Sequence, residues 1–256
     1  MSSPNILVTN DDGIDSPGIY ALWQAMSEIG SPTVIAPNIE QSAASHSISL
    51  NKPLFIKYIS RNFGFKGWCV NGTPADCTKI GIKRILDQKP DLIISGINRG
   101  ANLGINLIYS GTISAATEGA LLGIPSIAIS LASFKTDNYR ASKIIATEIA
   151  EYVLENNIPK GTLLNVNVPY GDPEDINGKL ITRQGNQFFK DDFEKRTDPR
   201  GNTYYWIKGE KIDNDTSIDY DGKAIEQNYI SITPINFNLT DESYLTELKK
   251  DFKCII

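Results

Sequence analysis

The sequence has few of the residues that build disulfide frameworks and zinc sites. It contains one histidine, His46, and three cysteines, at positions 69, 77 and 254. Because the number of cysteines is odd and none of them forms a C-x-x-C pair, neither a disulfide framework nor a structural zinc site is expected. We predict that all three cysteines are buried free thiols.

Basic and long apolar tracts are missing as well. Lys plus Arg number 25 against 30 Asp plus Glu, and no run of five or six basic residues occurs. This balance argues against binding of a nucleic acid polymer, although a single nucleotide could still bind. No apolar run approaches the roughly 20 residues of a membrane span, and MSSPNILV lacks the segments of a signal peptide. We therefore expect a cytoplasmic protein without a membrane partner.

Familiar phosphate-binding fingerprints do not fit either. Glycines 96, 100 and 104 recur every fourth residue instead of as G-x-G-x-x-G, and G-x-x-x-x-G-K-[ST] is absent. A Rossmann dehydrogenase and a P-loop NTPase are therefore disfavoured. The order NDDG after the first apolar run also differs from the D-x-D that a haloacid-dehalogenase-type phosphatase needs.

The first two thirds of the chain alternate strand-like and helix-like segments, which is typical of a parallel sheet covered by helices. The last third is rich in turns and polar loops, and we expect antiparallel strands there. The division is a catalytic core over 1–170 and an extension over 171–256 with strands, a hairpin and a terminal helix that serves oligomerisation. Core strands are predicted at 6–9, 33–36, 92–95, 126–130 and 163–167, helices at 17–29, 75–86, 114–122 and 139–155, and later strands at 180–183, 204–207 and 229–233.

Two adjacent aspartates, Asp11 and Asp12, end the first predicted strand in NILVTNDDG. Their repulsion must be offset by solvent, by a cation or by hydrogen bonds from the next turn. A hard divalent cation such as Mg²⁺ or Mn²⁺ binds carboxylate, amide and hydroxyl oxygens, and it would turn the repulsion into attraction. A solvated Asp-Gly turn is the alternative for this stretch alone.

Two later loops should reach the same sheet edge, because ligands of open parallel sheets bind at the carboxyl ends of the strands. In APNIEQSAASHS (36–47), Ser42 could complete a metal shell and His46 could contact substrate, although an ordinary flexible loop is the alternative. In SGINRGANLGINLIYSGTISAATEG (95–119), Asn98 and Asn102 alternate with glycines. Asparagine offers an oxygen to a metal and N–H donors to a phosphate.

The end of that stretch, Ser110-Gly111-Thr112, leads into a helix whose N-terminus can hold an anion. Tight packing of a glycine-rich loop is the alternative explanation. A further segment, VNGTPADCT (70–78), suits a tight turn followed by a helix start and is interpreted as scaffold.

Taken together, VTNDDGIDSPGI, VIAPNIEQSAASHS, VNGTPADC and the 95–119 stretch resemble the motifs of the SurE family of survival proteins, metal-dependent nucleotidases and acid phosphatases. The resemblance is dense from Ile6 to about Gly119 and weaker in TDPRGNTYYWIKG and YISITPI. It implies a Rossmann-like, three-layer α/β domain whose C-terminal hairpin or helix is exchanged between protomers of a homodimer or homotetramer. Where many members have DRNRSGASN, this chain has NIEQSAASH, which lacks a basic residue and a glycine but keeps Ser42.

The resemblance also assigns roles to individual positions. It implies one divalent cation per subunit, Mg²⁺ or Mn²⁺, on Asp11, Asp12, Ser42 and Asn98, with Asp11, Asp12 and Asn98 as the catalytic residues. It places phosphate on Asn102, Ser110, Gly111 and Thr112, and we add His46 as a substrate contact.

The predicted reaction is hydrolysis of a nucleoside 5′-monophosphate, with 3′-monophosphates and short polyphosphate as further candidate substrates. Water is favoured over an aspartate as the attacking group. The alternative function is a non-catalytic Mg²⁺-dependent switch like a response-regulator receiver. Such a domain needs an acceptor aspartate at the end of its third core strand, where this chain has SGIN.

Overall fold

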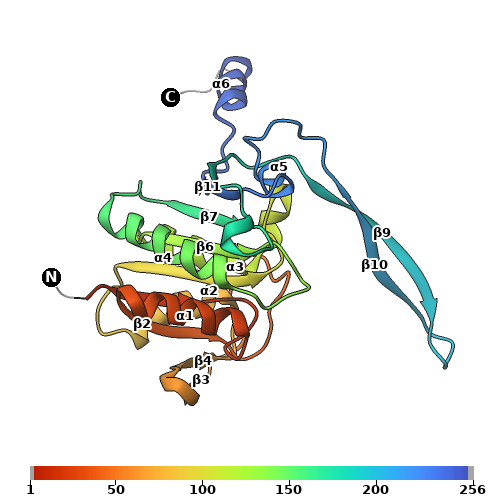
Figure 1. Ribbon diagram of the computed structural model, residues 1–256. Coiled ribbons are helices and arrows are strands. Elements are labelled where there is room, and N and C mark those ends of the chain that lie inside the picture. The colour runs from red at the N-terminus through yellow and green to blue at the C-terminus, as the bar shows by residue number, and fades with distance from the viewer. Residues whose placement is uncertain (1–2, 253–256) are drawn as a thin grey trace.

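The computed structural model describes residues 3–252 and consists of a sheet between two layers of helices, with a long β-ribbon projecting from one side (Figure 1). Helices α1 (Pro17–Ile29) and α4 (Arg140–Glu155) cover one face of the sheet, and α2 (Pro74–Ile80) and α3 (Gly111–Leu121) cover the other. The nine strands of the sheet lie in the order β3 (Ile56–Ser60), β4 (Lys66–Val70), β2 (Ser31–Pro37), β1 (Asn5–Thr9), β5 (Leu92–Arg99), β6 (Ser126–Leu131), β7 (Thr162–Val168), β11 (Ile230–Asn236) and β8 (Lys179–Ile181).

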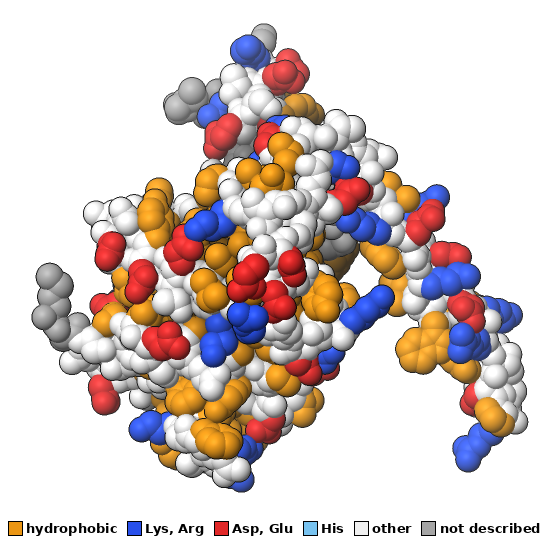
Figure 2. Space-filling model, in the orientation of Figure 1, with side chains coloured by type: hydrophobic (Ala, Val, Ile, Leu, Met, Phe, Trp, Pro, Cys, Tyr) orange, Lys and Arg blue, Asp and Glu red, His pale blue; other side chains and the backbone are white. Residues whose placement is uncertain are grey.

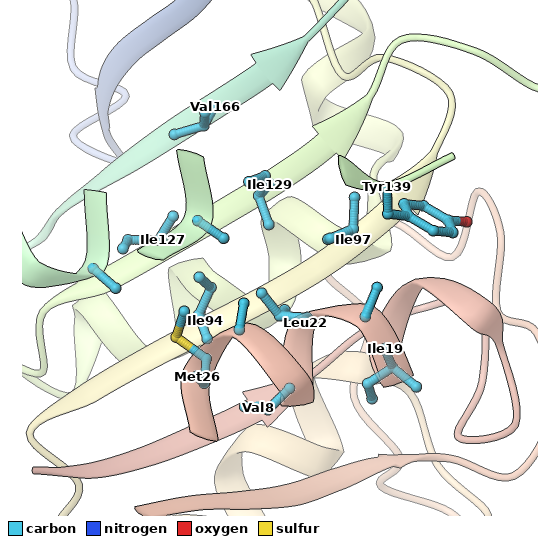
Figure 3. Close-up of a cluster of buried hydrophobic side chains, with 14 of the residues drawn as sticks. Val8, Ile19, Leu22, Met26, Ile94, Ile97, Ile127, Ile129, Tyr139 and Val166 are labelled. Atoms are coloured by element: carbon cyan, nitrogen blue, oxygen red, sulfur yellow. The ribbon is translucent and has the colours of Figure 1, made fainter. Parts of the chain in front are cut away.

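Strand β1 shows how the two helical layers are filled. Successive side chains of a strand point to opposite faces, so Ile6 and Val8 belong to the core under α1 and α4, while Leu7 belongs to the core under α2. All three are essentially inaccessible to solvent. Figure 3 shows the first of these cores, with strand side chains meeting those of α1. The three consecutive apolar residues Ile6, Leu7 and Val8 therefore reflect burial of this strand on both faces.

Helix α1 places its apolar stripe on this core. The Ser16 side chain accepts a hydrogen bond from the Ile19 N–H at the start of the helix, and Pro17 occupies the first helical position. Ile19, Leu22 and Met26 recur at helical spacing and are fully buried (Figure 3). Burial of each such side chain contributes about 1.5–3 kcal/mol, so the loop from β1 to α1 enters a firmly held helix.

The α/β fold and the five core strands are confirmed, with β1, β2, β5, β6 and β7 extending one to four residues beyond the predicted bounds. The helices at 17–29 and 139–155 are also confirmed within one residue. The predicted start at Ser114 is wrong, because α3 begins at Gly111 with Ser110 as its N-cap. The helix predicted to end at Leu86 changes after Ile80 into a π-helical turn, Gly81–Ile85.

Two strands of the core, β3 and β4, escaped prediction. Their alternation is interrupted by lysines and a glycine in IKYIS and KGWCV, and β3 is an edge strand that is mostly exposed. β4 pairs parallel to β2, and β3 pairs antiparallel to β4.

Within the last third of the chain, β8 and β11 join the nine-stranded sheet, while two further strands form a separate ribbon. β11 pairs antiparallel to β7, as expected, but β8 pairs parallel to β11, so the prediction of antiparallel pairing is wrong for β8. The strand at 204–207 is part of a ribbon of β9 (Phe188–Thr197) and β10 (Thr203–Ile212). A short helix α5 (Asp221–Glu226) precedes β11, and α6 (Glu242–Asp251) follows it. The division at residue 170 stays a prediction.

Cysteine burial follows the prediction in part. Cys77 is a buried free thiol and Cys69 is a half-buried one, while Cys254 lies outside the described residues. None of the helices formed by residues 3–252 combines the length and apolar character needed to cross a membrane.

Candidate active site

The carboxyl ends of β1 and β5 meet at the point where the strand order reverses. β1 and β5 are parallel neighbours with Thr9 opposite Ser95. After β1 the chain moves to β2 on one side, and after β5 it moves to β6 on the other. The loops after the two strands therefore diverge and leave a crevice between them, the usual ligand position in open α/β sheets.

The turn after β1 is fixed by its own side chains and by α3. Asn10 donates hydrogen bonds to the Gly13 carbonyl, 3.0 Å, and to the Ser16 Oγ, 2.8 Å. Asp11 is 5% exposed, and its Oδ1 accepts a 2.6 Å hydrogen bond from the Thr112 hydroxyl. Asp12 is more open, and its Oδ2 accepts a 3.2 Å hydrogen bond from the backbone N–H of Arg99. Each aspartate is thus tied to a different later segment.

Both carboxyls are harder to ionise than ordinary aspartates. Burial raises the pKa of Asp11, and hydrogen bonds from Thr112 oppose that effect. Burial and the neighbouring charge of Asp11 raise the pKa of Asp12 to about 6. Within residues 3–252, neither aspartate forms an ion pair with Lys, Arg or His. The pair is therefore an electrostatically costly arrangement that a cation would relieve.

Asn98 lies near the carboxyl end of β5, after a shift in the register of β5 with β6 between Ser95 and Asn98. Its Nδ2 donates a 2.8 Å hydrogen bond to the Gly100 carbonyl, which leaves the amide oxygen Oδ1 as its free polar atom. The next residue, Arg99, donates its backbone N–H to Asp12. Asn98 thus directly precedes the residue that contacts Asp12, and its grouping with both aspartates at a metal site stays a prediction.

The N-terminus of α3 packs directly against Asp11. The Ser110 Oγ caps the helix by accepting from the Ile113 N–H, 3.2 Å. A Cβ on Gly111 would lie 2.7 Å from the Asp11 Cβ, so only glycine fits there. Thr112 is fully buried and its hydroxyl is committed to Asp11. Contact of these three residues with phosphate stays a prediction, whereas the hydroxyl of Thr112 positions a carboxylate.

The second loop supplies Ser42 at the pocket and His46 further away. The Gln41 N–H donates to the Asp11 carbonyl, 2.7 Å, which ties this loop to the end of β1. Ser42 is exposed, and its hydroxyl donates to Glu40. His46 Nε2 lies 3.0 Å from Glu118 Oε2 on α3. His46 therefore anchors the loop to α3, and its contact with substrate stays a prediction.

Asn102 is held by strands β6 and β7. Its N–H donates to the Asn167 Oδ1, 2.8 Å, and its carbonyl accepts from both Asn165 and Asn167 at 2.9 Å. Its side-chain Nδ2 donates to the Ser130 Oγ, 2.9 Å. Asn165 and Asn167 were not predicted as site residues. Two asparagines in an otherwise apolar buried strand, TLLNVNV, were the signal that could have found them.

Beside Asp12 and Ser42 the loops enclose a pocket of about 570 Å³. Arg99, Glu40 and Phe134 also line it and were not singled out from the sequence. Arg99 directly follows SGIN, so its position next to the predicted metal ligand Asn98 could have marked it as a site residue. Within residues 3–252, no three His, Cys, Asp or Glu side chains are grouped so that they could hold a metal. The predicted donors are of another kind, two carboxylates with one hydroxyl and one amide.

Comparisons with known proteins agree over most of the chain. Residues 6–191 match the family model described as "Survival protein SurE". The sequence is 47% identical to a 5′-nucleotidase SurE of Thermosipho africanus, covering 97% of this chain and 98% of that protein. It is 46% identical to a 5′-nucleotidase SurE of Thermosipho melanesiensis, with the same coverage. A crystal structure of a SurE protein from Aquifex aeolicus superposes with a TM-score of 0.84 at 39% identity, covering 97% of this chain and all of that one.

Proposed function

Because this chain belongs to the survival protein SurE family, we propose that it is a 5′-nucleotidase that hydrolyses nucleoside 5′-monophosphates to nucleoside and phosphate with the help of one divalent cation per subunit. The observation that carries the proposal is the pair Asp11 and Asp12, which lies where the strand order of the sheet reverses. Asp11 is buried and Asp12 is half-buried, and the pKa values of both carboxyls are raised. Relatives with nearly full-length similarity are named 5′-nucleotidases.

The residues that would hold the cation are Asp11, Asp12, Ser42 and Asn98. All four offer oxygen, which suits Mg²⁺ or Mn²⁺. The free Oδ1 of Asn98 and the lone pairs of the Ser42 hydroxyl are available, because each residue uses only its hydrogens in its hydrogen bond. When bound, the cation would neutralise charge on the phosphate and on the transition state.

The chain's own groups orient the reaction. Thr112 fixes Asp11, and the backbone N–H of Arg99 fixes Asp12. The positive end of α3 faces the same point, where it favours an anionic phosphate. Preorganised groups of this kind lower the barrier because they need no rearrangement as charge develops. We favour water as the attacking group, since both aspartates are committed as ligands and Asp11 is also hydrogen-bonded.

We propose nucleoside 3′-monophosphates and short polyphosphate as further substrates. We also propose that the chain assembles into a homodimer or homotetramer. The receiver-like switch has no support in the structure. It requires an acceptor aspartate at the end of β5, where this chain has Asn98 and Arg99.

The experiment is phosphate release from AMP, 3′-AMP and tripolyphosphate with Mg²⁺, with Mn²⁺ and with EDTA. We expect release from AMP that depends on the cation and falls at least about 100-fold in Asn98→Ala. Unchanged release in EDTA would contradict the metal mechanism. Absence of release from every ester under all conditions would contradict the nucleotidase.

A further inference from the structure

The pocket beside Asp12 has an apolar wall that the phosphate chemistry does not use. Phe134 and Ile39 line it together with Asp12, Ser42 and Arg99. Phe134 is 74% exposed and Ile39 is 63% exposed. A volume of about 570 Å³ lies within the range of small-molecule sites, whose walls are mainly apolar. The pocket therefore combines a polar end with an open aromatic surface.

Phe134 is fixed relative to the end of β5. It follows β6, and its carbonyl accepts a 2.8 Å hydrogen bond from the Arg99 Nη2. Its ring rests on Gly100, where an added Cβ would lie 2.2 Å from the Cζ and 2.5 Å from the Cε1 atom. Gly100 has a φ of +99°, which also favours glycine. One edge of the ring is thus packed on backbone, while most of its surface stays open.

We propose that Phe134 is the stacking platform for the base of the nucleotide, an inference that rests on the proposed nucleotidase function. Phosphate at the Asp11, Asp12 and Asn98 end would leave the nucleoside in the pocket whose wall Phe134 forms. Every nucleobase has a flat π face, so stacking on an aromatic ring binds all bases and favours none strongly. The substrate class is therefore nucleoside monophosphates of either base type, preferred over phosphate esters that carry no base.

A neighbouring pocket offers a competing aromatic surface. It is lined by Tyr20, Phe63 and Phe65 and shares Asp15 with the first pocket. Asp12 does not line it. Phe63 is 88% exposed, so Phe63→Ala is a matched control for removal of an open aromatic ring close to the site.

The test is steady-state kinetics on AMP, CMP and ribose 5-phosphate, which carries the same ester without a base. The readout is the ratio of kcat/KM for each nucleotide to kcat/KM for ribose 5-phosphate. We expect Phe134→Ala to lower this ratio about tenfold through KM, because stacking is binding energy of this order. Phe134→Trp should restore the ratio, and Phe63→Ala should leave it unchanged.

Three results would overturn the inference. Equal losses on AMP and ribose 5-phosphate in Phe134→Ala would assign the ring a structural role. A selective loss in Phe63→Ala would place the base in the neighbouring pocket. A wild-type ratio near one would show that no base is recognised, even if the enzyme is active. If the wild type hydrolysed no ester at all, the proposed function would fail and the subsite with it.

Discussion

At the end of β1, Asp12 keeps its proton up to a pH of about 6 when no cation is bound. Its pKa is raised above the ordinary value of 3.8, so the folded protein binds this proton more tightly than the unfolded chain does. The free energy of unfolding must therefore fall as the pH rises from about 4 to about 6, and it stays lower above that window. The charge that destabilises the cation-free fold is the charge that would bind a metal.

Asp12→Asn should raise the melting temperature of the protein in EDTA at pH 8 by several degrees. The advantage should shrink at pH 4–5, where the native aspartate is mostly protonated. The amide oxygen introduced by this substitution can still accept from the Arg99 N–H. Thermal unfolding at the two pH values measures the difference. An effect of equal size at both would show that the charge is not the cause.

Ala43 next to Ser42 has a φ of +56°, in the left-handed region. An L-residue there costs roughly 1–2 kcal/mol, which glycine avoids, and the family pattern has glycine at this position. Ala43→Gly should therefore be neutral or stabilise the protein by up to about 1 kcal/mol after the greater freedom of the unfolded chain is counted. Urea unfolding measures the change.

Ala44→Gly is the matched control, because Ala44 is not among the residues of positive φ. It should gain no stability. A gain in Ala44→Gly equal to that in Ala43→Gly would remove the conformational explanation.

At the scale of elements, the strands that could be predicted from the sequence are the buried ones. β1, β5, β6 and β7 are largely buried and each contains a short run of apolar residues, so their residues identify them. β3 and β9 lie exposed, and their lysines and acidic residues hide the alternation. Parallel pairing of β8 could not be predicted, because a strand of three residues joins the sheet only through a distant partner.

The same limit holds for the site. Asp11, Asp12 and Ser42 lie in loops after strands, and Asn98 lies near the carboxyl end of β5. The rule that ligands bind at the carboxyl edge of an open sheet selected all four as candidates, and their role as ligands stays a prediction. The hydrogen bond between Asp11 and Thr112 joins residues 101 positions apart, and nothing in the local sequence marks it. Phe134 is likewise positioned by distant residues, through the packing of its ring on Gly100 and the hydrogen bond from Arg99 to its carbonyl.

Helix α3 links the site to the second loop through Glu118. This carboxylate is 5% exposed, contacts His46 at 3.0 Å and forms an ion pair with Lys79 of α2. Hydrogen bonds from His46 and Lys79 outweigh burial, and they lower the pKa of Glu118 below its ordinary value. Glu118 is thus a positioning residue for the loop that carries Ser42.

Glu118→Gln should speed hydrogen exchange of the 41–49 backbone and lower kcat/KM on AMP severalfold, since it weakens a charge-assisted contact of about 1.5–3 kcal/mol. Glu148→Gln is the control. Glu148 pairs with Lys179 on the surface, where such pairs contribute little. If the backbone amides of 41–49 exchange at the wild-type rate in both variants, the contact between Glu118 and His46 has no role in ordering this loop.

At the scale of the whole molecule, the ribbon of β9 and β10 projects from the body and bears aromatic side chains (Figure 1 and Figure 2). Directly opposed residues of an antiparallel pair share a face, so one face carries Phe189, Phe193, Tyr205 and Ile207, each 45–62% exposed. The opposite face carries Phe188, Tyr204 and Trp206 beside its charged residues. Isolated two-stranded ribbons are marginally stable in water. We therefore expect another subunit to cover the face that carries Phe193 and Ile207.

Phe193→Asp combined with Ile207→Asp should reduce the mass measured by light scattering, because the two residues are register partners and both are exposed and apolar. Lys190→Glu combined with Glu210→Lys exchanges a charged pair on the opposite face and should leave the mass unchanged. A wild-type mass equal to one 28.2 kDa chain would contradict assembly through the ribbon.

We expect Asp12 to serve a cation-dependent hydrolysis, and Asp15 provides a control. Asp15 lines the same pocket but is exposed and paired with Arg61. The measurement is phosphate release from AMP in EDTA and after addition of Mn²⁺, for wild type, Asp12→Asn and Asp15→Asn. We predict that Mn²⁺ restores wild type and Asp15→Asn, while Asp12→Asn stays at least about 100-fold slower. Restoration of Asp12→Asn to the wild-type rate would contradict a role for the Asp12 carboxylate in this reaction.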